Sequence, residues 1–191
     1  MRKGFFSEAV REKAYEVAGI EKGAVAADIG AGTGFITEGL IGAGLRVIAV
    51  DQSESMLDRM REKFARTGLI DLRVGESENL PIPDQAVDYV FANMYLHHVE
   101  SPPAAIKEMS RVLKPGGRLV ITDLDEHGHT FLRTEQHDRW MGFKREDVKQ
   151  WLSEAGLKDA MTDCVGQNCC ADSCCGEESA SISIFVARGV K

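Results

Sequence analysis

The stretch Ala24-Val25-Ala26-Ala27-Asp28-Ile29-Gly30-Ala31-Gly32-Thr33-Gly34 decides the fold of this 191-residue chain. An apolar run that ends in closely spaced glycines predicts a buried strand and a tight turn, followed by a helix that we expect from about Thr33 to Ala43. Glycines let a backbone approach a ligand closely, and the start of a helix presents unpaired N–H groups. The turn therefore favours a nucleotide site over a tight turn that binds nothing.

The spacing of this turn is Gly-x-Gly-x-Gly, whereas a dinucleotide fingerprint has Gly-x-Gly-x-x-Gly, and residue 35 here is Phe. Asp51 lies 21 residues beyond Gly30, at the end of a second predicted strand, Arg46–Asp51. A carboxylate at that place can accept both hydroxyls of a ribose. Alone it would indicate only a solvated strand end, but together with the turn it indicates a sugar-binding site.

The rest of the chain continues the alternation of strands and helices. We expect further strands at 70–74, 86–92, 118–123, 157–165 and 181–188, and helices over the first 20 residues and at 53–66, 102–113 and 145–155. Ser53 is expected to cap the helix that follows it. Residues 125–139 are expected to form a loop or a short helical excursion, and 166–180 a loop. Such alternation predicts a parallel sheet with helices on both faces.

The composition limits the class of protein. Apolar residues make up 43% and charged residues 28%, as in ordinary globular proteins, and the length indicates one domain. The net charge of −7 argues against nucleic acid as the main partner. The sequence holds no run of the ~18–20 apolar residues that a membrane span needs, and charged residues at 8 and 11–13 interrupt any signal-peptide core. We therefore expect a cytoplasmic protein.

Five motifs occur in a fixed order over about residues 24–125, just over half of the chain. They are Asp28-x-Gly30-x-Gly32-x-Gly34, Val50-Asp51-Gln52-Ser53 with Met56-Leu57, Gly75 to Asp84, Val87 to Asn93 with Leu96-His97-His98-Val99, and Arg111 to Gly117. In these motifs the chain resembles the class I S-adenosylmethionine-dependent methyltransferases, and most closely the small-molecule branch that includes the quinone-biosynthesis enzymes.

The resemblance implies an α/β fold with a doubly wound, Rossmann-like sheet of seven strands, mostly parallel with an antiparallel last strand. It implies a single methyltransferase domain over residues 1–191. Within it, residues 1–22 would form an N-terminal helix, 23–125 the cofactor-binding core, and 126–191 a substrate-side segment with a helix and a final hairpin that carries the cysteines.

The resemblance also implies how S-adenosylmethionine would be held. The turn residues Gly30, Ala31, Gly32 and Gly34 would lie against its methionine part, and Asp28 would help to hold the amino group. Asp51 would bind the ribose hydroxyls, with Gln52 beside the adenosine. Glu76 would accept a hydrogen bond from the adenine amino group, with Ser77 near the ring, although most relatives have Asp-Ala at these two positions. Asn93 would place its main-chain carbonyl near the sulfonium.

Methyl transfer from a sulfonium needs alignment of donor and acceptor more than it needs a base, and alignment alone can contribute ~7–11 kcal/mol. The sequence therefore identifies no catalytic residue. His97 and His98 are as compatible with packing at the cofactor edge as with catalysis. His137 lies in the segment after the fifth strand, on the side where ligands of open parallel sheets bind, and is a candidate substrate or metal residue.

All five cysteines lie within twelve residues: Cys164, Cys169, Cys170, Cys174 and Cys175. The implied topology puts them in a hairpin at the carboxyl edge of the sheet, where the methyl acceptor should arrive. They could be inert, could hold zinc or another thiophilic metal, could capture a thiophilic acceptor such as arsenite, or could form disulfides as a redox switch.

These observations predict a methyltransferase that transfers a methyl group to a small molecule, with no nucleic acid or membrane as partner. The alternatives are a non-catalytic metal-binding or sensor protein on the same fold and, opposed by the glycine spacing, a nicotinamide-dependent oxidoreductase. The identity of the acceptor and the oligomeric state have no signal in the sequence.

Overall fold

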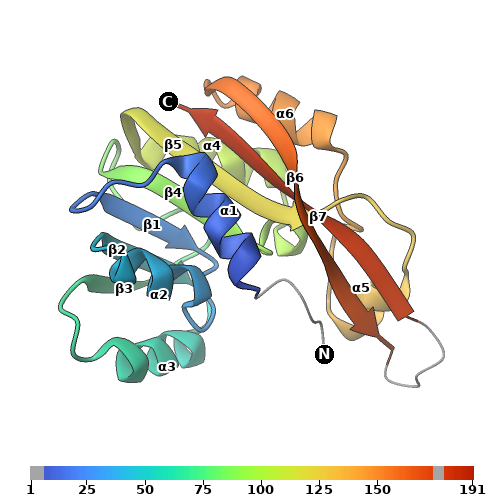
Figure 1. The fold of residues 1–191 in the computed structure, drawn as a ribbon, viewed down its shortest axis with the longest axis horizontal. Helices are drawn as coiled ribbons and strands as arrows, with labels where there is room; N and C mark the ends of the chain where they lie inside the picture. The colour runs from blue at the N-terminus through green and yellow to red at the C-terminus, as the bar shows by residue number, and fades with distance from the viewer. Residues whose placement is uncertain (1–6, 174–178) are drawn as a thin grey trace.

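Seven strands form one sheet in the order β3-β2-β1-β4-β5-β7-β6 (Figure 1) in the computed structural model of the protein, which describes residues 7–173 and 179–191. The strands are β1 (Val25–Ile29), β2 (Arg46–Asp51), β3 (Ile70–Val74), β4 (Val87–Asn93), β5 (Leu113–Leu124), β6 (Lys158–Asp172) and β7 (Ser179–Val190). Neighbours among β1 to β5 are parallel, and β7 is antiparallel to both β5 and β6. The predicted fold class is confirmed.

Helices cover both faces of this sheet (Figure 1). They are α1 (Glu8–Ala18), α2 (Phe35–Gly42), α3 (Glu54–Phe64), α4 (Pro102–Val112), α5 (Phe131–Glu135) and α6 (Arg145–Glu154), with a 3-10 turn, η1 (Leu96–His98). One buried cluster contains residues of α4 and α6, and a second contains residues of α1, α2 and α3. Successive residues of a strand point to opposite faces, so Val90 of β4 belongs to the first cluster and Phe91 to the second.

In the part of the chain that the structure describes, no helix has the length and apolar character needed to cross a membrane.

Strand β5 begins earlier than the sequence predicts. We expected this strand only from Arg118, but Leu113 already pairs with Val87 of β4. The Gly116 N–H donates to the carbonyl of Lys191 at 2.9 Å, and the Lys191 N–H donates to the carbonyl of Gly117 at 2.8 Å. The glycine segment is therefore tied to the end of β7.

The β6–β7 hairpin is longer than predicted, and the expected loop over 166–180 is wrong for its first part. The register shifts between Cys164 and Asn168, around Gly166 with φ 76°, and pairing then continues through Cys170 to Asp172. Adjacent strand residues face opposite sides, so Cys169 is buried while Cys170 is exposed, as is Cys164. Cys174 and Cys175 lie outside the described residues.

Residues 125–143, called the strap below, run back over η1 after β5. The N–H groups of Arg139 and Trp140 both donate to the carbonyl of His97, at 3.0 and 3.1 Å. The indole Nε1 of Trp140 donates to the carbonyl of Val99 at 3.0 Å. The strap contains the short helix α5, in agreement with the predicted excursion, and these bonds fix it beside the carboxyl end of β4.

Candidate functional site

The glycine turn between β1 and α2 has the backbone that its sequence demands. Gly30, Gly32 and Gly34 have φ values of 68°, 54° and 81°, a region that residues with a side chain rarely adopt. The Gly30 N–H donates to the carbonyl of Val50 at 2.9 Å, which binds the turn to β2. A Cβ added at Gly30 would lie 2.1–2.7 Å from ring atoms of Tyr95. Only glycine therefore fits under this ring.

Asp51 connects the turn to the start of α3. Its Oδ2 accepts the Gly32 N–H and its Oδ1 accepts the Ser53 N–H, both at 2.8 Å. Each carboxylate oxygen has a second lone pair that remains available to a ligand hydroxyl. Ser53 occupies the N-cap position as predicted, but its hydroxyl does not cap the helix and instead lies 2.9 Å from the Ser55 hydroxyl.

Asp28 is a buried carboxylate at the end of β1, with 2% of its surface exposed. Its Oδ2 accepts two hydrogen bonds from Thr37, from the hydroxyl at 2.6 Å and from the N–H at 3.1 Å. Burial raises the pKa of Asp28 to about 6, against the opposing effect of the Thr37 hydrogen bonds. A positively charged ligand group beside it would favour the ionised form.

These elements surround a cavity of about 380 Å³, called the turn cavity below. Among the residues that line it are Asp28, Gly30, Ala31, Gly32, Asp51, Gln52 and Asn93, all predicted as cofactor residues. Asn93 stands at the end of β4, and its side-chain oxygen accepts a hydrogen bond from the Thr122 hydroxyl at 2.6 Å. Residues that the sequence analysis did not select also line the cavity, among them Met94, Tyr95 and Gln136.

A second cavity of about 590 Å³, the side cavity, adjoins the first, since Gln52, Tyr95 and His98 line both. Glu76 and His137 line the side cavity. His137 therefore lies near the predicted adenine residue and is not grouped with the described cysteines.

Two predicted cofactor residues line neither of these cavities. Ser77 is buried, and its hydroxyl donates to Glu78 Oε2 at 2.8 Å. Gly34 stands at the N-cap of α2, and a Cβ there would lie 2.6 Å from the ring of Phe64. Its place beside Phe64 accounts for a glycine at that position without any ligand.

A buried histidine–carboxylate pair lies behind the two cavities, and sequence reasoning missed it. His97 Nδ1 lies 2.7 Å from Asp123 Oδ1, and both side chains are fully buried. Burial acts to raise the pKa of Asp123, but the charge of His97 and the hydrogen bonds to Asp123 outweigh it, so the pKa is lowered. Asp123 is therefore an ionised carboxylate inside the protein.

His98 follows on the same 3-10 turn and keeps 39% of its side chain exposed. Burial of the rest of the ring, and next the charge of His97, lower the pKa of His98 to about 4. The neutral imidazole lies between the turn cavity and the side cavity.

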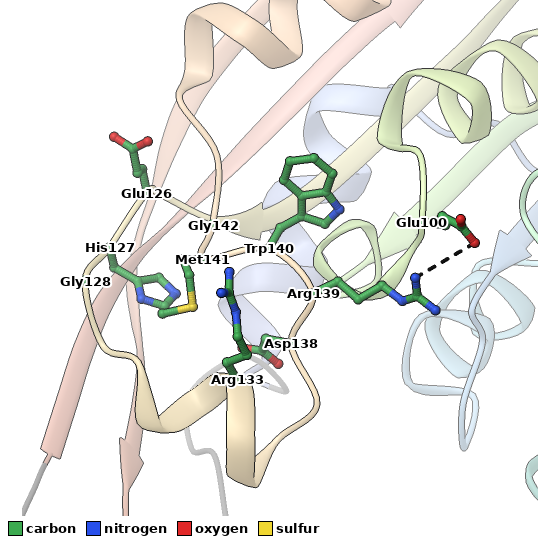
Figure 2. A pocket seen from close by; sticks show the side chains of 10 residues that line it. All are labelled: Glu100, Glu126, His127, Gly128, Arg133, Asp138, Arg139, Trp140, Met141 and Gly142. Atoms are coloured by element: carbon green, nitrogen blue, oxygen red, sulfur yellow. Dashed lines mark ion pairs between the residues drawn. The ribbon is translucent and has the colours of Figure 1, made fainter.

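The strap borders an outer cavity of about 900 Å³ (Figure 2). Figure 2 shows Arg139 extended toward Glu100, with Nη1 and Oε2 3.9 Å apart, and the ring of Trp140 above them. Asp138 and Trp140 line this cavity, whereas Glu100 and Arg139 line both it and the side cavity. The outer cavity and the side cavity therefore adjoin.

The described cysteines do not converge on a metal or ligand. Cys164 Sγ lies 3.6 Å from the Ser183 hydroxyl, and Cys170 Sγ lies 3.8 Å from the Ser181 hydroxyl. Cys169 is part of a buried apolar cluster with residues of α5 and β7. Among residues 7–173 and 179–191, no group of three metal-capable side chains includes a cysteine.

Comparison with known proteins agrees with this geometry. A family model described as a methyltransferase domain matches residues 27–121, about half of the chain. The chain is 40% identical over 137 residues to the biotin biosynthesis bifunctional protein BioHC of Cellvibrio japonicus, covering 69% of this chain and 27% of that protein. It is 31% identical over 167 residues to 2-methyl-6-phytyl-1,4-hydroquinone methyltransferase 1 of Oryza sativa subsp. japonica, covering 85% and 50%.

Among solved structures, the YcgJ protein of Bacillus subtilis has a TM-score of 0.78 at 17% identity, covering 97% of this chain and 99% of that one. That likeness shows the fold alone. The chain spans at most half the length of the two curated relatives.

The sheet order, the glycine turn at the carboxyl ends of its strands and the matched domain define the class of protein. The chain belongs to the class I S-adenosylmethionine-dependent methyltransferases. The family assignment leaves the nicotinamide oxidoreductase alternative without support.

Proposed function

We propose that the protein binds S-adenosylmethionine across the turn cavity and the side cavity and transfers its methyl group to a small-molecule acceptor. The observation that carries the proposal is that residues from the ends of β1, β2 and β4 line one cavity, among them Asp28, Asp51 and Asn93. Open parallel sheets bind their ligands at the carboxyl ends of the strands.

The cytoplasmic location expected from the sequence stays a prediction.

Three carboxylates in the turn cavity and the side cavity would each bind a different part of the cofactor. Asp51 is already oriented by two backbone N–H groups and would accept hydrogen bonds from the ribose hydroxyls. Asp28, ionised beside a cation, would attract the ammonium of the methionine part. Glu76 lines the side cavity and would face the adenine amino group. Adenosine would then lie at the boundary between the two cavities, where Gln52 and Tyr95 line both.

Bound cofactor supplies an activated methyl group, so the chain has to align the acceptor with it and exclude water. The sulfonium would lie near Asn93, within the turn cavity. An acceptor that entered through the outer and side cavities would pass Arg139 and His98 on its way to this point. The acceptor lone pair forms the new bond to the methyl carbon as the carbon–sulfur bond breaks, and any acceptor proton leaves to solvent. Positioning of this kind can contribute ~7–11 kcal/mol.

Capture of arsenite, or of zinc, by the cysteines stays a narrower prediction. Cys164 and Cys170 are exposed on one side of the hairpin and Cys169 is buried. Binding by three thiolates would therefore need Cys174 or Cys175, which lie outside the described residues. The direct test is anaerobic transfer of a labelled methyl group to arsenite, in the wild type and in a variant with Cys169→Ala and the other four cysteines changed to Ser. Transfer that requires the cysteines supports the prediction, and equal transfer in both proteins contradicts it.

Calorimetric titration with S-adenosylhomocysteine tests the proposal as a whole. The wild type should bind one equivalent, and Asp51→Ala should weaken binding by about 10- to 100-fold, since hydrogen bonds to a charged group contribute about 1.5–3 kcal/mol. Asp51→Asn should lie between the two. Asp58→Ala removes an exposed carboxylate of α3 that pairs with Arg61, and is the matched control. No binding by the wild type, or equal loss in both alanine variants, would overturn the proposed site.

A further inference from the structure

We propose that Arg111 of α4 is a positioning residue for the cofactor, because it holds the loop that carries Glu76 and so determines how well the site recognises an adenine amino group. This role rests on the proposed function, in which Glu76 faces that group. Arg111 itself lines neither the turn cavity nor the side cavity. It would therefore act on the cofactor through the loop, residues 75–84.

Arg111 binds the backbone of this loop directly. Its Nη2 donates to the carbonyl of Leu80 at 3.2 Å and to the carbonyl of Ile82 at 2.9 Å. Its Nη1 donates to the carboxylate of Asp84, at the end of the loop. A guanidinium presents five N–H donors in a rigid, planar fork, so this one side chain fixes three points of the loop.

Glu108, three residues earlier on α4, completes the attachment. Arg111 donates to it twice, from Nε to Oε2 at 2.8 Å and from Nη2 to Oε1 at 2.7 Å. The hydrogen bonds from Arg111 lower the pKa of Glu108 against the opposing effect of burial. Glu108 Oε1 also accepts the Leu80 N–H at 2.9 Å. One ion pair on α4 therefore binds both the carbonyl and the N–H of Leu80.

A second arginine, on β3, binds the carbonyl between these two. Arg73 Nη1 donates to the carbonyl of Pro81 at 2.5 Å, so three consecutive carbonyls of the loop each accept an arginine N–H. Pro81 in turn packs against Gly75, where an added Cβ would lie 2.5 Å from the proline ring. Gly75 directly precedes Glu76, and the Asn79 N–H donates to the Glu76 carbonyl at 3.2 Å. The fixed segment therefore determines where Glu76 stands.

Fixing the backbone matters because the side chain of Glu76 is long. Glu76 is an exposed residue of the side cavity, and a long side chain loses conformational freedom when it binds a ligand. A backbone that is already in place lowers this cost. The bonds also give one role to two separate sequence motifs, Gly75 to Asp84 and Arg111 to Gly117, which meet where Arg111 contacts the loop.

Calorimetric titration with two ligands tests this role. S-adenosylhomocysteine carries the adenine amino group, and S-inosylhomocysteine carries a carbonyl oxygen in its place. We expect the wild type to prefer S-adenosylhomocysteine by about 10- to 100-fold, the range for one hydrogen bond to a charged group. Glu76→Ala should remove most of this preference. Arg111→Lys keeps the charge but not the fork, and should lower the preference by about fivefold or more while changing the affinity for S-inosylhomocysteine by less than about twofold.

Arg61→Lys, in an exposed pair with Asp58 on α3, is the matched control and should keep the preference of the wild type. Circular dichroism verifies the fold of each variant. Should Arg111→Lys fail to fold, Glu108→Gln takes its place with the same expected direction. A folded variant that keeps the full preference, or that weakens both ligands equally as a merely structural role would, overturns the proposal. Equal binding of the two ligands by the wild type also overturns it. A wild type that binds neither ligand overturns the proposed function itself.

Discussion

The ring of Tyr95 lies directly against Gly30, so that a Cβ on this glycine would come within 2.1 Å of the ring. Tyr95 thereby separates the two cavities while lining both of them. Two constraints therefore require glycine at position 30: its positive φ, and the ring of Tyr95, which follows the end of β4.

Gly30→Ala should destabilise the protein and weaken binding of S-adenosylhomocysteine. The positive φ costs about 1–3 kcal/mol for a residue with a side chain, and Tyr95 must also move. Gly23→Ala is the control, because Gly23 has φ 86° but no atom within 4 Å of an added Cβ. Urea unfolding and calorimetry should show a stability loss in both variants and an affinity loss in Gly30→Ala alone. If Gly30→Ala bound S-adenosylhomocysteine as tightly as the wild type, the close packing of Tyr95 on Gly30 would not matter for binding.

Asp28→Asn should alter how stability depends on pH. The pKa of Asp28 is raised from 3.8 to about 6 in the folded protein, so its contribution to stability is present below about pH 4 and is lost as the pH rises through 6. Asp28→Asn lacks this loss. Its free energy of unfolding should therefore rise relative to that of the wild type by up to about 3 kcal/mol between pH 4 and 7.5. Urea unfolding at both pH values measures the gain. A constant difference between the two proteins would show that Asp28 keeps an ordinary pKa.

Asp123→Asn should cost about 3–5 kcal/mol of unfolding free energy, because it removes one partner of a fully buried pair with His97. Asp58→Asn, in an exposed pair with Arg61, should cost less than about 1 kcal/mol. Urea unfolding compares the free energies of unfolding of the two variants with that of the wild type. Similar small losses in both would mean that the buried pair contributes little.

Trp140→Phe should loosen the strap without unfolding the sheet. It removes the indole hydrogen bond to the Val99 carbonyl, worth about 0.5–1.5 kcal/mol, while an aromatic ring is retained. Hydrogen exchange should become faster over residues 126–142 and stay unchanged in β1 and β4. Tyr89→Phe, which removes the hydroxyl hydrogen bond to the Gly19 carbonyl, is the matched control and should leave exchange in the strap unchanged.

The gathering of the proposed cofactor residues around one cavity was predictable because it depends on local spacing. Gly30 follows β1 directly and Asp51 ends β2, and the ends of adjacent parallel strands meet at one edge, so motif order alone places them together. The same reasoning places Asn93 at the end of β4. The alternation of apolar residues identified these strands to within one or two residues.

The histidine–carboxylate group was not predictable from spacing. Asp123 is 26 residues from His97 in the chain, and Asp138 follows a segment with no periodic pattern, whose path depends on hydrogen bonds to η1. In the β6–β7 hairpin, by contrast, the local sequence gave a clear prediction that was wrong. Glycine and polar residues after Val165 indicate a loop locally, but pairing with β7 extends the strand, because strand formation depends on tertiary partners more than on local preference.

The position of β7 has a consequence for how the protein is made. β7 lies between β5 and β6 in the sheet, although it is the last of the three to leave the ribosome. Strands β1 to β5 can pair as they emerge, but in this sheet β6 has β7 as its neighbour and must wait for it. During synthesis the cysteine-bearing strand β6 therefore stays unpaired until β7 has emerged, and for that interval the thiol of Cys169, which the finished sheet buries, is exposed to solvent.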